Sequence, residues 1–493
     1  MSSLQGGYSL THIAAGIAVV ALLMLGVGFY AIYQELASLR SQVEGLNTRY
    51  EEISESLEEV QGAFESSRGD IESIASSLES IQDRVSKIEE RLGSAATQSD
   101  LDAVARELAS LTQQLEDLQA RIQALEESGA EAGERLDQLA MALQDLQARL
   151  ASLEERVDEV YASLYFPVTV VDGTGTPVVL LERPERIVSM APSATETLYY
   201  VGALDRVVGV DQYSDFPPEL NEAKEAGEVE VIGGYWNPSI EAILSLEPDL
   251  VVGVASVPNH IQVKKVLSAY GIPVILLPDN SLEDVRESMM IVGKATGEVV
   301  GAYEAVLKFD MAVAAAGLLL EGVDPVETAV VVWPNPLFVV GGGTWEHEVI
   351  ELAGGVNVYG DTQGWPQVSY ESLLEADPDV IILMGGHSDG GVTVEGFIEA
   401  LESQLGEAAR EIDAVASRRI YVLLDEYNDS FARPSPRTVL SIYVLAVLIQ
   451  PSAFDIQPGD LPSEVSPETL DVLGLLEGRV PEEVLEFLGE ALG

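Results

Sequence analysis

The chain contains no cysteine in its 493 residues. Disulfide bonds, thiolate metal sites, a cysteine nucleophile and the lipid-modified cysteine of a bacterial lipoprotein are therefore excluded. Basic residues are also few, because 26 Lys and Arg stand against 82 Asp and Glu and leave a formal net charge of -56. Phosphate backbones and anionic membrane surfaces repel such a polyanion, so nucleic acid is not an expected partner. Hydrophobic residues make up 47% of the chain, which predicts folded cores and not a solvated acidic tail.

Enzymatic signatures are missing as well. The sequence has no P-loop GxxxxGK[ST], no G-x-S-x-G nucleophile elbow, no HExxH and no dinucleotide fingerprint. The glycine run from Gly341 to Gly343 lacks the strand-to-helix context of a phosphate loop. We therefore expect a protein that is not an enzyme, with no catalytic residues and no cofactor.

The first 34 residues contain no Asp, Glu, Lys or Arg, and residues 13–33 form an apolar run long enough to cross a bilayer. We expect a retained transmembrane anchor over residues 1–34, which makes the chain a single-pass protein of the cell membrane. A cleaved signal peptide is the alternative. Against it, the segment before the run lacks Lys and Arg, and no small-x-small cleavage site follows.

Residues 35–165 carry the heptad pattern of a coiled coil, with apolar residues at alternating steps of three and four. The register runs from Leu36 to Leu92, is lost over residues 93–99, and resumes at Leu101 with a weak junction near Gly129. This pattern predicts a long helical stalk whose apolar seam is covered in a parallel homo-oligomer. The alternative is an antiparallel bundle within one chain, folded back at the two glycine-containing breaks.

From Phe166 onward, short β-rich runs alternate with helical segments, which predicts an α/β head with mostly parallel sheets. Their nearly continuous apolar character fits sheets that are covered on both faces. The expected strands lie within residues 186–190, 206–210, 249–254, 272–277, 328–333, 379–384 and 419–424.

An internal repeat divides this head into two lobes. Residues 239–252 (SIEAILSLEPDLVV) align without gaps with residues 369–382 (SYESLLEADPDVII). Each copy is typical of a serine N-cap, a short amphipathic helix, a Pro-Asp turn and a buried strand. The linker between the lobes begins at a capping box of Ser281 and Asp284 and is interrupted near Gly293 to Gly297. We expect lobe 1 over residues 166–280, this helical linker over 281–325, lobe 2 over 326–455 and an acidic helical tail over 456–493.

Several blocks of the head resemble one known family. They are RIVSMAPSATETLYYVG, VVGVDQYSDFPPE, IEAILSLEPDLVV, GGGTWEHEVIELAGGVNVYGD, GWPQVSYESLL and FARPSPR. Together they are similar to the substrate-binding proteins of ABC importers with a rigid interlobe helix, the class that takes up cobalamin, iron-siderophores, haem and some metals. Within that class, the cobalamin binders are the most similar. The resemblance covers about residues 167–450 and leaves out the stalk and the anchor.

This resemblance implies an α/β, two-lobed, periplasmic-binding-protein-like head of class III, with a helical backbone between its lobes. It also implies capture of a ligand in the cleft between the lobes, small hinge motion, and delivery to a permease that a separate ATPase drives. The head must then meet solute outside the cytoplasm, so we expect the N-terminus inside and the head extracellular. A surface adhesin or sensory protein raised on the coiled coil is the alternative.

Cleft aromatics are the first candidates for ligand binding. By their positions in the matching motifs, Tyr213, Tyr235, Phe338 and Trp365 resemble cleft aromatics of the cobalamin binders, and Trp236 is an alternate beside Tyr235. Tyr235 and Trp365 are favoured over ordinary packing because both open the repeat at equivalent places. The block DSFARPSPR resembles a further wall of the cleft, and its candidates are Asp429, Phe431 and Arg433.

Glu241 and Glu371 are equivalent carboxylates of the repeat, one in each lobe and early in a helix. Stabilisation of the helix dipole is the ordinary role of such a residue. The resemblance implies a second role, in which these acids pair with Arg on the two permease subunits.

The ligand class follows from what the cleft lacks. His260, His347 and His387 show no chelating spacing, so we expect no metal site. Anionic ferric siderophores require Arg or Lys in the cleft, and Arg433 is the only motif-placed candidate. We therefore expect a largely uncharged corrinoid, cobalamin, with a ferric siderophore or haem as the alternatives.

Overall fold

The computed structural model of the chain describes helical residues between 73 and 88, helix α3 (Gln98–Glu127), residue 148, and residues 166–386 and 391–493. The expected transmembrane segment and much of the heptad pattern lie outside the described residues. No helix among the described residues is both long and apolar enough to span a membrane.

Two described stretches of the coiled-coil region pack against each other. Arg84, before the break in the heptads, donates a hydrogen bond to Gln114 Oε1 of α3 at 2.6 Å, and its Nε lies 3.8 Å from Glu107 Oε1. Because the partners lie at similar distances from the break but on opposite sides of it, the two stretches run antiparallel. These contacts fit the alternative of an antiparallel bundle that folds back within one chain. The expectation of a straight stalk is therefore wrong at this break. Seam residues are buried within the single chain, and they include Ile81, Val85, Ile88, Leu108, Leu111 and Leu115.

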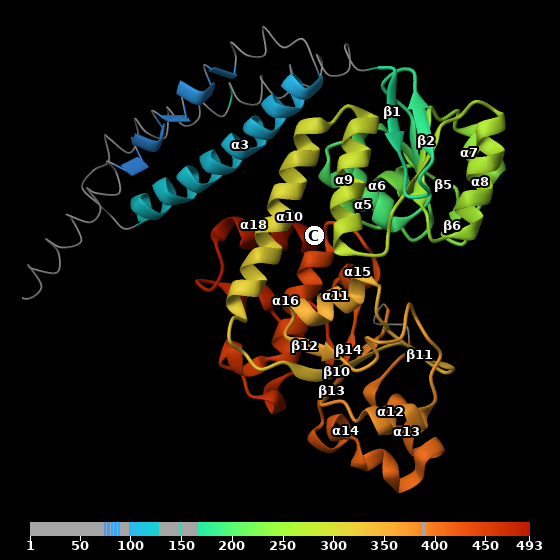
Figure 1. The fold of residues 1–493 in the computed structure, drawn as a ribbon, viewed down its shortest axis with the longest axis vertical. Coiled ribbons are helices and arrows are strands. Elements are labelled where there is room, and N and C mark those ends of the chain that lie inside the picture. Colours follow the sequence, from blue (N-terminus) through green and yellow to red (C-terminus); the bar gives the residue numbers. More distant parts are fainter. Residues whose placement is uncertain are drawn as a thin grey trace, which may run out of the picture. The chain divides into compact units, whose positions relative to one another are not determined.

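Lobe 1 is a five-stranded parallel sheet with helices on both faces (Figure 1). Its strand order is β5-β4-β3-β8-β9, and two short antiparallel hairpins, β1–β2 and β6–β7, accompany it. The four expected strands of this lobe are confirmed. The elements are β1 (Val168–Val171), β2 (Pro177–Leu180), β3 (Ile187–Ser189), α5 (Pro192–Tyr200), β4 (Val207–Val210), α6 (Pro218–Ala226), β5 (Glu230–Val231), β6 (Gly233–Gly234), β7 (Asn237–Pro238), α7 (Ile240–Ser245), β8 (Leu250–Val254), α8 (Pro258–Ala269) and β9 (Val274–Leu277).

Two helices connect the lobes. α9 (Leu282–Thr296) begins at Ser281, whose hydroxyl accepts a hydrogen bond from Asp284 N at 3.0 Å, as the capping box predicts. Gly297 ends it with a left-handed φ of 83°, which a residue without a Cβ adopts readily. α10 (Val299–Leu319) then runs beside α9 and onward to lobe 2 (Figure 1). The expected interruption is therefore confirmed, and the linker is a pair of packed helices.

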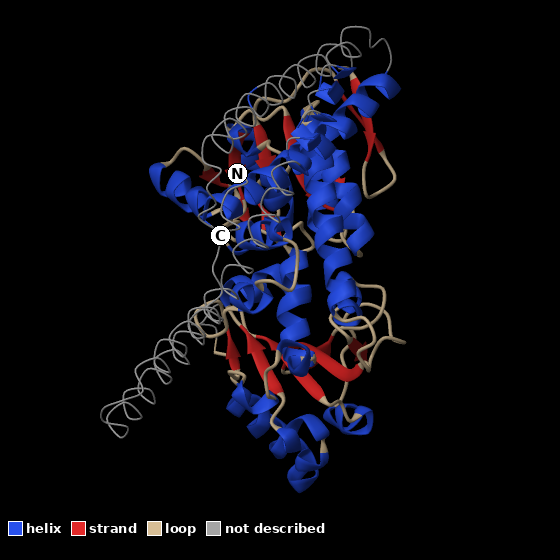
Figure 2. Ribbon diagram, turned by 90° about the vertical axis from the view of Figure 1, so that its left-hand side faces the viewer, coloured by secondary structure: helices blue, strands red, loops and turns tan. Residues whose placement is uncertain are grey.

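Lobe 2 is built around a six-stranded sheet in which β11-β10-β13-β14-β15 are consecutive and β12 pairs with β10. All its pairings are parallel except that of β11 with β10. Figure 2 shows helices on either side of these strands. The three expected strands are confirmed. The elements are β10 (Val326–Pro334), β11 (Leu337–Val339), α11 (Trp345–Leu352), β12 (Gly355–Asn357), α12 (Tyr370–Ala376), β13 (Val380–Met384), α13 (Val394–Leu405), α14 (Asp413–Ser417), β14 (Ile420–Leu423), α15 (Asp425–Ala432), α16 (Thr438–Ile449), β15 (Glu464–Val465), α17 (Val472–Leu476) and α18 (Glu482–Leu492).

The stretch 456–493, expected as a helical tail, is integrated into the head. β15 pairs with β14 at the edge of the lobe 2 sheet, and α18 packs against α10 and α16. Arg437 Nε donates to the carbonyl oxygen of Ala491 at 2.7 Å, and the ring of Phe487 lies edge-on to Tyr200 of lobe 1. These contacts bind the last helix to both lobes.

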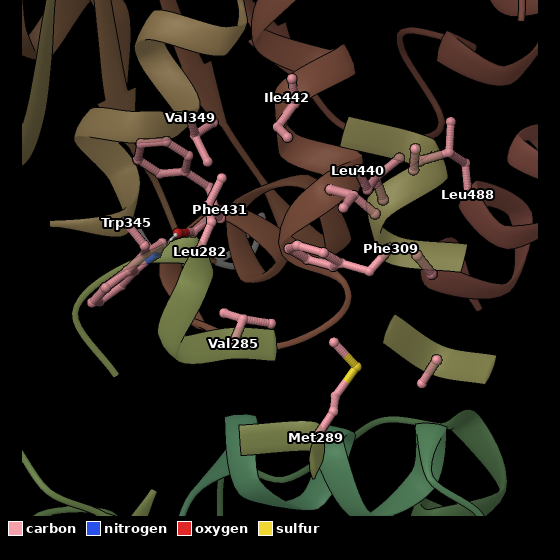
Figure 3. Close-up of a cluster of buried hydrophobic side chains, with 14 of the residues drawn as sticks. Leu282, Val285, Met289, Phe309, Trp345, Val349, Phe431, Leu440, Ile442 and Leu488 are labelled. Carbon is pink, nitrogen blue, oxygen red and sulfur yellow. Dashed lines mark hydrogen bonds between the residues drawn. The ribbon is translucent and has the colours of Figure 1, made fainter. Parts of the chain in front are cut away.

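One hydrophobic core runs through the middle of the head. Strand residues alternate between this shared core and a smaller core on the outer side of each sheet, so that Leu250 and Val252 face inward while Val251 faces outward. Every residue of α16 is buried, which its uniformly apolar sequence explains. In Figure 3, Phe309 of α10 lies beside Leu440 of α16. The helices between the lobes are therefore part of a common interior.

Candidate ligand-binding cleft

A cleft of about 500 Å³ lies between the two lobes. This volume falls within the range of small-molecule binding sites, about 300–1,000 Å³. Lobe 1 lines it with Pro192, Ser193, Tyr213, Tyr235, Trp236, Ser256 and Asp279. Lobe 2 lines it with Val332, Trp345, Glu346, Trp365, Met384, Asp429, Ala432, Arg433 and Pro434.

The cleft lies at the carboxyl ends of strands in both sheets. In lobe 1, Ser193, Tyr213, Ser256 and Asp279 follow β3, β4, β8 and β9 respectively. In lobe 2, Met384 ends β13, and the residues around Arg433 follow β14 through α15. Open α/β sheets bind ligands at this edge, where loops diverge. The topology therefore brings together residues that are far apart in the sequence.

Tyr235 and Trp236 occupy the turn between β6 and β7. Their rings are nearly perpendicular, with centroids 4.7 Å apart, and 63% of Trp236 is exposed. Buried His260 supports the turn from behind, because its Nδ1 accepts from Val254 N at 3.2 Å and its Nε2 lies 2.8 Å from Tyr235 O. Burial lowers the pKa of His260, so the ring is neutral and Nε2 is the donor to that carbonyl. His260 positions the aromatic turn.

Trp365 forms the opposing aromatic wall together with Trp345. Their ring centroids are 5.5 Å apart, and Trp345 Nε1 donates to Phe431 O at 2.9 Å, as drawn in Figure 3. The loop that carries Trp365 lies against the glycine run, since Gly341 N donates to Gly364 O at 2.8 Å. A Cβ on Gly341 would stand 2.1 Å from Thr362 O, so only glycine permits this approach. The glycine run thus has a structural role in holding an aromatic wall.

Arg433 joins the lobes through an ion-pair network. Its guanidinium contacts Glu196 at 3.0 Å and Asp215 at 2.6 Å in lobe 1, and Asp429 at 2.7 Å in lobe 2. Burial acts to lower the pKa of Arg433, but these carboxylates raise it well above its usual value. Arg437 contacts Glu196 as well, at 3.2 Å. The guanidinium that lines the cleft is therefore matched by carboxylates before any ligand arrives.

Two predicted ligand-binding residues lie elsewhere. Phe431 is fully buried in the shared core beneath Trp345, because it is on the inner face of α15. Phe338 lies on β11, where it pairs with Gln367 and Trp333, and it does not line the cleft. The expectation that Phe338 and Phe431 line the cleft therefore differs from the structure. The other candidates line the cleft, namely Tyr213, Tyr235, Trp236, Trp365, Asp429 and Arg433.

Two buried acids line the cleft and were not predicted. Burial raises the pKa of Asp279 to about 6, although Ser256 donates to it through its backbone N–H at 3.2 Å and through its hydroxyl. Burial raises the pKa of Glu346 to about 8. Glu346 belongs to the block GGGTWEHEVIELAGGVNVYGD, but its position beside a tryptophan in a helix gives no sign of a site.

Glu241 and Glu371 are exposed at the first turns of α7 and α12. Their helices begin as the repeat predicts, with Ser239 Oγ accepting from Ala242 N and Ser369 Oγ from Ser372 N, both at 3.2 Å. Hydrogen bonds from the backbone N–H of Glu371 and from Ser369 lower the pKa of Glu371. Both acids are thus available to a partner, one on each lobe.

The histidines form no metal site among the described residues. The ring of His347 lies beside Asn357 and 3.5 Å from Glu351, as expected for a packing residue on a helix. No group of three or more potential ligands occurs in the described part of the chain. His387 lies outside the described residues.

Comparison with known proteins places this geometry in context. A model of the family described as periplasmic binding protein matches residues 187–427, and one for a CT398-like coiled coil hairpin domain matches residues 32–172. The uncharacterized ABC transporter substrate-binding lipoprotein YvrC of Bacillus subtilis is 28% identical over 59% of this chain and 87% of its own length. The vitamin B12-binding protein of Vibrio parahaemolyticus is 27% identical over 53% of this chain and 88% of its own length.

A solved structure also shares the fold. CeuE of Helicobacter pylori, in a complex with nickel and histidine, aligns with a TM-score of 0.50 at 17% identity and covers 65% of this chain and 98% of its own.

The family model that matches residues 32–172 describes a coiled coil hairpin, which agrees with the antiparallel contacts of Arg84.

Proposed function

The head of this chain belongs to the periplasmic binding protein family, and from that premise we propose that the chain is the substrate-binding protein of an ABC importer. The Bacillus relative is named for that role, and the Vibrio relative is named for binding vitamin B12. In the proposed role, the head captures a ligand in the interlobe cleft outside the cytoplasm. It then delivers the ligand to permease and ATPase subunits, while residues 1–34 anchor the chain in the cell membrane.

We infer that the ligand is a corrinoid, cobalamin. The observation that carries this inference is a cleft with aromatic walls on both lobes and no unmatched positive charge. Among the described residues that line the cleft, Arg433 is the one cationic side chain, and Glu196, Asp215 and Asp429 surround it. Aromatic faces suit a large flat ligand, and the lack of free cationic donors along these walls disfavours an anionic one.

The two alternative ligands fit this cleft less well. A ferric siderophore with net negative charge would face Asp279, Glu346 and Asp429 without a free Arg or Lys among the described lining residues to balance it. Haem brings carboxylates of its own and commonly takes an axial histidine. Within the described part of the chain, His260 is the histidine that contacts the aromatic turn, and both its ring nitrogens are already hydrogen-bonded.

Isothermal titration of the purified full-length chain tests this proposal. We expect saturable binding of cyanocobalamin, and weaker or no binding of haem and of an anionic ferric catecholate siderophore. Trp236→Ala should weaken cyanocobalamin binding at least tenfold, because the exposed indole is a contact surface for the ligand. Trp333→Ala is the matched control, since Trp333 is similarly exposed at 55% but does not line the cleft. Tighter binding of haem or siderophore would replace the corrinoid assignment.

A further inference from the structure

Glu346 is a buried acid that faces the cleft with half of its carboxyl group unsatisfied. It is the second residue of α11, it is 2% exposed, and it lines the cleft together with Trp345 and Trp365. Its Oε1 accepts a hydrogen bond from Trp365 Nε1 at 3.0 Å, whereas Oε2 has no hydrogen-bond partner. A buried polar atom without a partner is costly, and in a binding cleft a ligand can supply that partner.

No positive charge stands opposite this carboxyl group. Among the described residues, Glu346 forms no ion pair, and the guanidinium of Arg433 is held by three other carboxylates. On α11, His347 lies next to Glu351, and Glu348 accepts a hydrogen bond from Leu282 N at 2.7 Å. The remaining titratable groups that line the cleft in the described part of the chain are the acids Asp279 and Asp429 and the phenols of Tyr213 and Tyr235. A charged carboxylate at this position would be desolvated, and burial outweighs the hydrogen bonds, that from Trp365 among them, which favour the charged form.

We propose that Glu346 is a ligand-binding residue that acts as an uncharged carboxylic acid and donates a hydrogen bond from Oε2 to a neutral acceptor oxygen of the ligand. Trp365 fixes the orientation, because its N–H occupies Oε1 and leaves the proton for Oε2. An amide carbonyl, of the kind that fringes a corrinoid, is such an acceptor. This inference rests on the proposed function and specifies how that cleft selects its ligand.

The same residue selects against anionic ligands. A carboxylate or catecholate oxygen of a ligand can accept the hydrogen bond from Oε2, but it brings a negative charge to a site where the described residues offer no cation to balance it. An amide-rich neutral ligand gains the hydrogen bond without this cost. The aromatic walls therefore select a ligand by its shape, and Glu346 selects it by its charge and its hydrogen-bond acceptors.

Two substitutions at Glu346 test the hydrogen bond, with cyanocobalamin as the probe and the full-length chain as the protein. Glu346→Gln retains the shape and a donor N–H, so the affinity at pH 6.5 should stay within about threefold of wild type. Glu346→Leu retains similar bulk but no donor, so the affinity should fall at least fivefold. Glu351→Gln is the control, because Glu351 is exposed on the same helix and does not line the cleft.

The pH dependence of binding separates a donor from a packing residue. Burial raises the pKa of Glu346 to about 8, so wild-type affinity should fall at least fivefold between pH 7 and pH 9.5, as the proton is lost. Glu346→Gln should bind with a flat profile over this range. Asp279 loses its proton below pH 7, since burial raises the pKa of that acid only to about 6. Its titration therefore does not account for a change in affinity between pH 7 and pH 9.5.

A measurement without ligand checks the uncharged state separately. A carboxyl group whose pKa rises from 4.5 to about 8 on folding contributes stability below pH 4.5 that is lost as the pH rises towards 8. The melting temperature of wild type should therefore fall relative to that of Glu346→Gln across this window. Parallel profiles of the two proteins would show that Glu346 is ionised in the fold and would overturn the inference.

The outcomes also distinguish this inference from the proposed function. If wild type fails to bind cyanocobalamin, the corrinoid assignment is wrong. The proposed hydrogen bond from Glu346 to the ligand is then wrong as well, because it was inferred for a corrinoid. If wild type binds cyanocobalamin and Glu346→Leu binds it equally well, the proposed function stands and the role of Glu346 is overturned.

Discussion

At Arg433, a single guanidinium contacts carboxylates of both lobes. The side chain is 9% exposed, and Glu196 opposite it is 1% exposed, so the attraction is little screened by solvent. Ser435 donates to Oε2 of the same Glu196, and Arg437 lies 3.2 Å from the Oε1 atom that Arg433 also contacts. The network therefore ties the wall after α15 to α5 of lobe 1 at the back of the cleft.

Removal of this guanidinium should be strongly destabilising. In Arg433→Met, the carboxylates of Glu196, Asp215 and Asp429 lose their common partner, and breaking a buried pair costs about 3–5 kcal/mol. Chemical denaturation of the full-length chain measures the loss. Arg410→Met is the control, because Arg410 pairs with Glu402 in an exposed site and should cost less than about 1 kcal/mol. Equal losses in the two variants would contradict the role of the network.

Individual cleft residues were predictable where the chain carries a repeat or a turn. Tyr235 and Trp365 stand at equivalent places before a serine-capped helix, and both reach the cleft. Phe431 was misplaced because, in a helix, residues two positions apart point in different directions, so that Asp429 and Arg433 reach the cleft while Phe431 enters the core. Asp279 and Glu346 give no local signal, since only the fold brings them to the same cavity.

At the scale of elements, the loop that carries Trp365 depends on the glycine run before α11. Gly341→Ala would place a Cβ 2.1 Å from Thr362 O and 2.8 Å from Gly364 O, so the loop must move. We expect a loss of about 1–3 kcal/mol in stability. Cyanocobalamin affinity should fall about tenfold, because the tryptophan moves with the loop; such a loss corresponds to about 1.4 kcal/mol.

Gly317→Ala provides the matched comparison. Gly317 lies in α10, and no heavy atom lies within 4 Å of the position that a Cβ would occupy there, so alanine should stabilise the helix by up to about 1 kcal/mol. Titration and thermal unfolding of both variants provide the two measurements. Unchanged affinity in Gly341→Ala would mean that the glycine run does not set the position of Trp365.

The elements themselves followed the apolar runs closely. All seven expected strands are present, because parallel strands that are covered on both faces must be apolar throughout. β12, β15 and the β1–β2 hairpin were not predicted, since each is a short strand of two to four residues whose identity depends on its pairing partner. The break after Leu92 was visible in the heptads, but its meaning as a reversal needed the contacts of Arg84.

At the scale of the whole head, the shared core limits how far the lobes can separate. Both sheets present their inner faces to it, and α10, α16 and α18 fill the space between them. A wide hinge opening would expose this core, at a cost of about 25 cal/mol for each Å² of apolar surface. We therefore expect binding to proceed with small interlobe motion, and recognition of the head by a permease to rest on fixed surface groups.

Glu241 and Glu371 are our proposed surface groups for that contact. Reversal of both charges, in the double variant Glu241→Lys and Glu371→Lys, should abolish uptake by cells that contain the permease and ATPase, because complementary charges set the docking orientation. Cyanocobalamin affinity should remain within about twofold, since neither residue lines the cleft. The control is Glu225→Lys with Glu375→Lys, which changes two exposed acids of the same lobes. Normal uptake by the first double variant would rule out the docking assignment.

The aromatic walls also give the head an optical property. The chain has four tryptophans, and three of them, Trp236, Trp345 and Trp365, line the cleft, while Trp333 lies outside it. Most of the intrinsic ultraviolet emission of the protein therefore originates within contact distance of a bound ligand. A strongly absorbing macrocycle such as a corrin would quench it by energy transfer, leaving the residual signal of Trp333. Occupancy of the cleft can thus be followed in the unlabelled chain by its own fluorescence.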